Sequence, residues 1–299
     1  MRRMMIAAAL ALAPLALAAT AWGQAIPAPV VSDPTTDAAH PPHQSQVLAP
    51  SGGVGMNALF YLAGGAGPHP TVVLFHGLPG NEQNLDLAQA IRRAGWNVLT
   101  LHYRGSWGSP GTFSIAHVQE DAQAAKAFVR DPKIAAKFGI DTRRIVLAGH
   151  SMGGFAAVSA ARDDKALAGV IFLDGWNAGR TGAQLSALEP AARKQAAELR
   201  FDDFGNSLAG ATPISVVDEA VVHQKDWDVR GWAPRLTAAP LLVIGAAKAN
   251  GAENHAIAQA VAAAGGHVTD VTLPTDHPFS DHRIALAGLV VSWLQALPN

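Results

Sequence analysis

Six short apolar runs, most of them separated by segments with helical periodicity, constrain the fold of this 299-residue chain more than any other feature. The runs read TVVLFHG (71–77), WNVLTLHY (96–103), RIVLAGHS (144–151), AGVIFLD (168–174), PLLVIGA (240–246) and HVTDVTLP (267–274). Runs of this kind are typical of strands that are buried on both faces. Strands that alternate with helices predict an α/β fold, in which helices cover both faces of a mostly parallel central sheet.

Helices are expected in the segments between and after these strands. The predicted helices are one capped by Asn81 that carries Leu85, Leu87, Ala88 and Ile91, one over about Ala116 to Phe138, one after Ser151, one that contains Ile257 and Val261 and ends at Gly265-Gly266, and a last one with Leu286, Leu289, Val290, Trp293, Leu294 and Leu297 on one face.

The rest of the chain divides into two N-terminal segments and one insertion. Arg2 and Arg3 precede an apolar run and then small residues, so residues 1–25 are predicted to be a signal peptide. Residues 26–45 have the Pro-rich composition of a linker, and residues 46–299 are expected to form one domain that starts with a β-hairpin. The strand rhythm breaks once, and about residues 175–238 are predicted to form a helical cap over the strand ends.

Charge and cysteine content narrow the possible surroundings of the protein. A formal net charge of −1 gives no reason to expect a nucleic acid or an anionic membrane as partner. The N-terminal apolar run is short for a membrane span, which needs roughly 20 residues. The chain has no cysteine, which excludes disulfides, a thiolate nucleophile and lipidation of a cysteine. We therefore expect an exported protein, periplasmic or secreted, without a stable membrane anchor.

A serine stands between two glycines where a predicted strand becomes a helix, in Gly149-His150-Ser151-Met152-Gly153. This G-x-S-x-G pattern predicts a nucleophile elbow, a turn so sharp that side chains at Gly149 and Gly153 would collide with neighbouring elements. The elbow would raise the Ser151 hydroxyl above the sheet edge, next to the N–H of Met152 and a helix N-terminus.

A serine nucleophile needs a base, and His277 is the best placed of the twelve histidines. It follows the last predicted strand and precedes the last helix, in LPTDHPFSDHR. His282 is the rival, but it is expected in the first turn of that helix, and His255 is expected to be exposed on a helix. No set of histidines has zinc spacing, and neither a metal nor another cofactor is expected.

The second oxyanion donor is predicted in FHGLPGNEQN, the loop after the first core strand. His76-Gly77 turns the chain there, so that the N–H of Leu78 can join that of Met152 in facing a substrate carbonyl oxygen.

The acid that would orient His277 has two candidates. The usual place is just after PLLVIGA, where this chain has Ala249. Asp174 closes the preceding strand and is the preferred candidate, because a carboxylate at a strand end is fixed in position. Glu253 is the alternative acid, although it is typical of the N-terminal turn of a helix. Asp276, next to His277, is expected to form a turn.

Taken together, HGLPG, HYRGSWGSPG, GHSMGG and TDHPFSDHR resemble the α/β-hydrolase superfamily, in particular its dienelactone-hydrolase-like and prolyl-oligopeptidase-like members. The resemblance covers about residues 50 to 299. It implies Ser151 as nucleophile, His277 as base, and Leu78 and Met152 as oxyanion donors. It permits Asp174 as the acid, since some members of the superfamily place the acid after this earlier strand.

Aromatic residues near the predicted pocket have two possible roles. Tyr103 and Trp107, in the loop YRGSWGSPG, could touch the substrate, or the loop could be packed with Arg104 paired internally. Trp176 could form part of an apolar pocket with the capping Trp227 and Trp232, and ordinary core packing is an equal alternative.

The sequence therefore predicts a secreted serine hydrolase that cleaves carboxylic esters through an acyl-enzyme, on a small-molecule ester or a peptide-like substrate. One alternative is a peptidase or amidase with the same site. Another is a non-catalytic protein of this fold that binds a ligand or partner.

Overall fold

The computed structural model describes residues 25–201, 204 and 206–298, and its centre is an eight-stranded sheet in the order β1-β2-β4-β3-β5-β6-β7-β8. The strands are β1 (His43–Ser51), β2 (Val54–Leu62), β3 (His69–Phe75), β4 (Asn97–Leu101), β5 (Ile140–His150), β6 (Gly169–Leu173), β7 (Leu241–Ala246) and β8 (Val268–Leu273). The pairs β1–β2 and β2–β4 are antiparallel, and all other pairs are parallel. The predicted mostly parallel sheet, with all six predicted strands, is confirmed.

The predicted N-terminal hairpin is present, but it starts earlier than expected. His43 of β1 pairs with Leu62 of β2, so residues 43–45, predicted as linker, belong to the first strand. A short helix, α1 (Ala28–Val31), also lies within the predicted linker. A Pro-rich composition is typical of a linker, but proline restricts the backbone only of the residue before it. A strand can therefore begin at His43, directly after Pro42. The predicted signal peptide lies outside the described residues, apart from Ala25.

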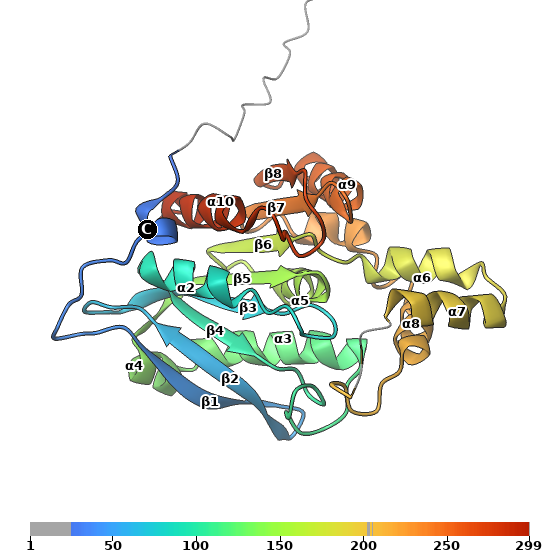
Figure 1. The fold of residues 1–299 in the computed structure, drawn as a ribbon, viewed down its shortest axis with the longest axis horizontal. Helices are drawn as coiled ribbons and strands as arrows, with labels where there is room; N and C mark the ends of the chain where they lie inside the picture. The colour runs from blue at the N-terminus through green and yellow to red at the C-terminus, as the bar shows by residue number, and fades with distance from the viewer. Residues whose placement is uncertain (1–24, 202–203, 205, 299) are drawn as a thin grey trace, which may run out of the picture.

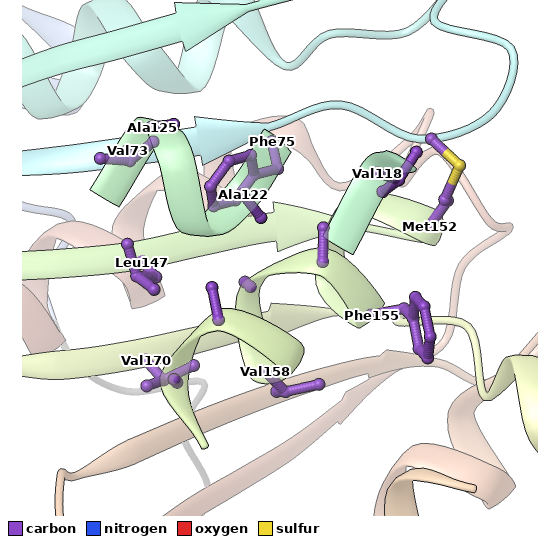
Figure 2. Packing of buried hydrophobic residues seen from close by; sticks show 14 of the residues in the cluster. Val73, Phe75, Val118, Ala122, Ala125, Leu147, Met152, Phe155, Val158 and Val170 are labelled. Atoms are coloured by element: carbon purple, nitrogen blue, oxygen red, sulfur yellow. The ribbon is translucent and has the colours of Figure 1, made fainter. Parts of the chain in front are cut away.

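Helices cover both faces of the sheet (Figure 1). One face carries α2 (Leu85–Arg93) and α10 (Arg283–Ala296), and the other carries α3 (Ile115–Arg130), α4 (Pro132–Phe138), α5 (Met152–Ala161) and α9 (Gly251–Ala263). Figure 2 shows Val73, Phe75 and Leu147 of the sheet close to apolar side chains of α3 and α5. This packing fixes the position of β5 and of the turn that follows it.

Two helix predictions are corrected. Asn84, not Asn81, is the N-cap residue of α2, since the chain reaches helical geometry only after a left-handed residue at Asn84. The predicted single helix over 116–138 is broken between α3 and α4 because Pro132 disfavours helical geometry at Asp131. Asp131 instead accepts hydrogen bonds from the first N–H groups of α4.

The chain between β6 and β7 forms α6 (Ala178–Ser186), α7 (Pro190–Arg200), α8 (Pro213–Val222) and a 3₁₀ helix, η2 (Val229–Arg235). Helices α6, α7 and α8 pack against one another and lie beyond the arrowheads of β5 and β6 (Figure 1). This is the segment expected as a cap, and the edge of the sheet beside it is where α/β folds bind ligands. Across the residues that the structure describes, no helix is both long and apolar enough to span a membrane.

Candidate active site

Ser151 occupies a strained turn between β5 and α5. Its φ of +58° and ψ of −121° are a conformation that few non-glycine residues adopt. A Cβ on Gly149 would overlap the backbone of Gly153, and one on Gly153 would overlap the carbonyl group of Phe75. The two glycines therefore permit the sharp turn, as the sequence predicts.

Asp174 and His277, which are 103 positions apart in the sequence, meet at the carboxyl edge of the sheet. The distance from His277 Nδ1 to Asp174 Oδ2 is 2.5 Å. The Asp174 side chain is completely buried, whereas the His277 side chain is 37% exposed. Since a carboxylate can only accept, Nδ1 carries the proton, and Nε2 is left as the basic nitrogen of the ring.

The Asp174 carboxylate is fixed by the end of β7 and the loop that follows it. The backbone N–H of Ala246 donates to its Oδ1 at 2.8 Å, and the N–H of Asn250 donates to its Oδ2 at 3.3 Å. Asn250 also donates from its side chain to the Asp174 carbonyl oxygen at 2.9 Å. The loop that lacks an acid at Ala249 thus supplies hydrogen-bond donors to the acid from the neighbouring strand.

Glu253, the alternative acid, has other partners. Its carboxylate accepts hydrogen bonds from Asn177 at 2.9 Å and from Arg230 Nε at 2.8 Å. It also forms an ion pair with Arg180 at 2.8 Å. The structure therefore brings Asp174, and not Glu253, to His277.

His150, the residue before Ser151, holds the backbone of the His277 loop. Its Nε2 donates to the His277 carbonyl oxygen at 2.9 Å, and the two ring centroids are 4.5 Å apart. Burial, and in second place the neighbouring His277, lower the pKa of His150 to about 3, so the ring is neutral at physiological pH. No sequence pattern assigns a role to this residue.

The loop after β3 approaches Ser151 closely at Gly77. A Cβ at Gly77 would lie 3.0 Å from the Cβ of Ser151. His76 Nδ1 donates to the Gly77 carbonyl oxygen at 2.7 Å. Because the C=O and N–H of one trans peptide unit point in opposite directions, this bond turns the N–H of Leu78 away from His76. Burial lowers the pKa of His76 to about 4, so this ring is also neutral.

A pocket of about 330 Å³ joins these elements. It is lined by Leu78, Ser151, Met152, Trp176, Arg200, Phe201, Ala249, Asn250 and His277. Among the described residues no hydrogen bond links Ser151 Oγ to His277, although both line this pocket; such bonds are often long before substrate binds. Larger hollows of about 560 and 510 Å³ lie elsewhere on the molecule and contain neither residue.

Of the three aromatic residues predicted to contact the substrate, only one lines the pocket. Trp176 lines the pocket. Tyr103 is completely buried and its hydroxyl donates to the His76 carbonyl oxygen at 3.2 Å, so its predicted contact with substrate is wrong. Trp107 also lies outside the pocket lining and donates from Nε1 to the Pro79 carbonyl oxygen at 2.7 Å. Their loop is packed from within, because Arg104 pairs with the buried Asp121 at 2.6 Å.

The two rival histidines contact other carboxylates. His282 is the N-cap residue of α10 and contacts Asp281 at 2.8 Å, and His255 is exposed and contacts Asp270. Asp276 accepts a hydrogen bond from the N–H of Ser280 at 2.7 Å, as a turn-former does. Nowhere in residues 25–201, 204 and 206–298 do three or more His, Cys, Asp or Glu side chains form a group that could hold a metal ion.

No sequence motif predicts three of the residues that line the site. Asn250 follows an ordinary loop sequence, and Arg200 and Phe201 end a helix of the insertion. Only the position of the insertion, directly after Asp174 at the end of β6, indicated that some of its residues would reach the strand ends.

A serine at a strand-to-helix turn, above a mostly parallel sheet and beside an Asp–His pair, defines the class of α/β hydrolases. A comparison with family models agrees, because residues 72–289 match the model of the alpha/beta hydrolase family. The chain belongs to this family, and the predicted superfamily and fold are confirmed.

The similarity to an individual curated relative covers only part of the chain. The chain is 31% identical over 157 residues to the quorum-quenching protein AidA of Acinetobacter baumannii, a match that covers 49% of this chain and 48% of that protein. The chain thus spans about half the length of this curated relative.

Solved structures share the fold at low sequence identity. The carboxylesterase EstE1 from a metagenomic library superposes with a TM-score of 0.62 at 18% identity, over 90% of this chain and 92% of that one. An esterase from Pyrobaculum calidifontis gives 0.64 at 18% identity, over 86% and 87% of the two chains. An esterase from Pseudomonas putida gives 0.60 at 19% identity, over 89% and 86%.

Proposed function

We propose that this protein is a serine hydrolase that cleaves carboxylic esters of small molecules through an acyl-enzyme. The observation that carries the proposal is the contact between Asp174 and His277 at the pocket that also contains the strained Ser151. The structural neighbours EstE1 and the esterases from Pyrobaculum calidifontis and Pseudomonas putida favour esters over amides.

In the proposed first step, Ser151 Oγ attacks the ester carbonyl carbon while His277 Nε2 takes the hydroxyl proton. Asp174 keeps the other ring proton on Nδ1 and stabilises the imidazolium that forms. The carbonyl π-electrons move to oxygen, and this oxyanion accepts hydrogen bonds from the N–H groups of Leu78 and Met152. Met152 is the first residue of α5, so its N–H has no acceptor within the helix.

Collapse of the tetrahedral intermediate breaks the ester C–O bond. The leaving alcohol receives the proton from His277 Nε2, and the acyl group stays on Ser151. A water molecule then attacks the acyl carbon and gives a proton to the same nitrogen. The bond between the acyl carbon and Ser151 Oγ breaks, Oγ takes that proton back from His277 Nε2, and the carboxylic acid leaves. His76 and His150 remain neutral and hold the oxyanion loop and the His277 loop in place.

The test is hydrolysis of short-chain p-nitrophenyl esters and of matched p-nitroanilides by the wild-type protein and by Ser151→Ala. We expect ester turnover that the substitution abolishes and slower or absent anilide turnover. Anilide turnover as fast as ester turnover would favour the peptidase or amidase alternative. Absence of both activities in a folded wild-type protein would favour the non-catalytic binding protein.

We also propose that the protein is exported and acts in the periplasm or the medium. The support is the sequence of residues 1–25, with Arg2 and Arg3 before an apolar run and small residues. N-terminal sequencing of protein recovered from the periplasm should find the chain starting after Ala21 or Ala25. Recovery only from the cytosol, with Met1 retained, would refute export.

A further inference from the structure

The oxyanion loop, residues 76–80, is held by side chains at the carbonyl groups on either side of Leu78. His76 Nδ1 donates to the carbonyl oxygen of the residue before Leu78 at 2.7 Å. The indole Nε1 of Trp107 donates to the carbonyl oxygen of Pro79, the residue after it, also at 2.7 Å. The residue whose N–H is the proposed oxyanion donor therefore lies between two fixed carbonyl groups.

The Trp107 indole lies directly against the backbone of this loop. A Cβ on Gly80 would lie 2.5 Å from the indole Nε1 and 2.8 Å from Cε1 of His76, so no side chain fits between them. Trp107 is 40% exposed, so its burial contributes less to the core than that of a fully buried tryptophan. Its nitrogen nevertheless meets a backbone carbonyl group instead of water, which suits the side chain to hold the loop.

The backbone around Trp107 is fixed in turn by the insertion between β6 and β7. The N–H of Trp107 donates to the carbonyl oxygen of Ser207 at 3.0 Å. The N–H of Ala209 donates back to the carbonyl oxygen of Gly105 at 2.7 Å. The insertion is thus connected to the oxyanion loop through Trp107, although Trp107 lies outside the pocket lining.

We infer that Trp107 is a positioning residue for the oxyanion hole. Its Nε1–H holds the carbonyl group of Pro79 and thereby keeps the N–H of Leu78 aimed at the oxygen on which negative charge develops. This inference rests on the proposed ester hydrolysis and adds a residue to its machinery.

The inference predicts an effect on kcat and not on KM. Hydrogen bonds in an oxyanion hole are stronger in the transition state than in the bound ester, so their loss slows the chemical steps. Formation and hydrolysis of the acyl-enzyme both pass through such an oxyanion. Both steps should therefore slow together, which lowers kcat and leaves KM nearly unchanged.

The test variant is Trp107→Phe, which removes the indole N–H and keeps an aromatic ring. Trp96→Phe is the matched control, because Trp96 directly precedes β4 and so lies at the opposite edge of the sheet from the site. Trp96 is only 3% exposed, so the control should lose at least as much thermal stability as Trp107→Phe. Hydrolysis of p-nitrophenyl butyrate and thermal unfolding are measured for both variants and the wild type.

We expect Trp107→Phe to lower kcat about fivefold or more, with KM within about twofold of the wild type. The loss should be smaller than the loss of about a hundredfold or more that follows removal of a whole oxyanion donor, because the N–H of Leu78 is still present. Trp96→Phe should keep both constants.

A trifluoromethyl ketone that carries the propyl chain of the butyrate ester gives a readout that a merely structural role would not change. Ser151 Oγ adds reversibly to its carbonyl carbon, His277 takes the hydroxyl proton, and the hemiketal oxyanion faces the same N–H donors. The inhibition constant of this ketone should rise in Trp107→Phe by about the factor by which kcat/KM falls. In Trp96→Phe it should stay unchanged.

Unchanged kcat and ketone affinity in Trp107→Phe, or an equal loss in Trp96→Phe, would overturn the inference while ester hydrolysis stands. A higher KM at constant kcat, or unfolding of Trp107→Phe below the assay temperature, would also overturn it, since the side chain would then serve binding or stability. If the wild type does not hydrolyse p-nitrophenyl butyrate, the proposed function fails, and the inference fails with it. Wild-type turnover therefore separates the two failures.

Discussion

Replacement of Asp174 by asparagine tests the proposed acid of the catalytic group. The carboxylate accepts three hydrogen bonds through its side chain, from the N–H of Ala246, the N–H of Asn250 and His277 Nδ1. In Asp174→Asn, the amide oxygen should remain with Ala246, whose N–H is buried and needs an acceptor. The amide NH₂ group then faces His277 Nδ1 in place of Oδ2.

That exchange should change the tautomer of His277. An NH₂ group can only donate, so Nδ1 must become the acceptor, and the ring proton moves to Nε2. A protonated Nε2 cannot take the proton of Ser151. The wrong tautomer costs about ten-thousandfold in kcat in a Ser-His-Asp triad, which corresponds to about 5 kcal/mol of transition-state stabilisation.

The assay is steady-state hydrolysis of a p-nitrophenyl ester, with thermal unfolding as a check that the variant folds. Glu253→Gln is the matched control, because Glu253 pairs with Arg180 and Arg230 and not with His277. We expect that control to keep kcat within about threefold of the wild type, because its partners Arg180 and Arg230 are partly exposed to solvent, which weakens both ion pairs. A folded Asp174→Asn variant that keeps more than about a tenth of the wild-type kcat would refute the reasoning.

Three further predictions concern the supporting residues. His150→Leu removes the donor to the His277 carbonyl oxygen, and a loss of about 1 kcal/mol should lower kcat/KM about fivefold in ester assays; an unchanged value would exclude a positioning role. Burial lowers the pKa of His76 and His150 below the ordinary value of 6.5, so the unfolded chain binds protons first as the pH falls. When the pH falls from about 7.5 to about 5, the free energy of urea unfolding should therefore decrease by about 2 kcal/mol for each of the two histidines. An equal free energy of unfolding at both pH values would contradict this prediction. Gly149→Ala should cost about 3 kcal/mol or more in thermal unfolding because its Cβ overlaps helix backbone, whereas Gly231→Ala, with open space around its Cβ, should cost little.

The parts of the fold that could be predicted are those that local sequence determines. Buried parallel strands need continuous apolar runs, so all six runs became strands. The elbow was predictable because only glycine fits at positions 149 and 153, where a side chain would overlap backbone. Helix ends were less predictable, since the choice between Asn81 and Asn84 as N-cap depends on the path of the preceding loop.

The contents of the site depend on contacts between distant residues. Asp174 and Glu253 were both plausible acids, and the decision follows from strand order, because β6 and β7 are neighbours and place the loop after β7 around Asp174. Arg180 and Arg230, which neutralise Glu253, come from the insertion, and no sequence pattern connects them to it.

Tyr103 illustrates the limit of reasoning from strand ends. Like Asp174, it follows a predicted strand at the ligand-binding edge. Its loop turns inward, however, and the hydroxyl bonds to the carbonyl oxygen of His76. A residue at a strand end can therefore support the site from beneath without reaching the pocket.

The most direct test of the central role given to Ser151 is covalent labelling. The purified mature protein would be treated with a fluorophosphonate, digested and mapped by mass spectrometry, beside Ser151→Ala. The account predicts one adduct, on Ser151, which is absent from the variant and forms in parallel with the loss of ester hydrolysis. An unlabelled but folded wild-type protein, or an adduct on another residue that accounts for the lost activity, would contradict it.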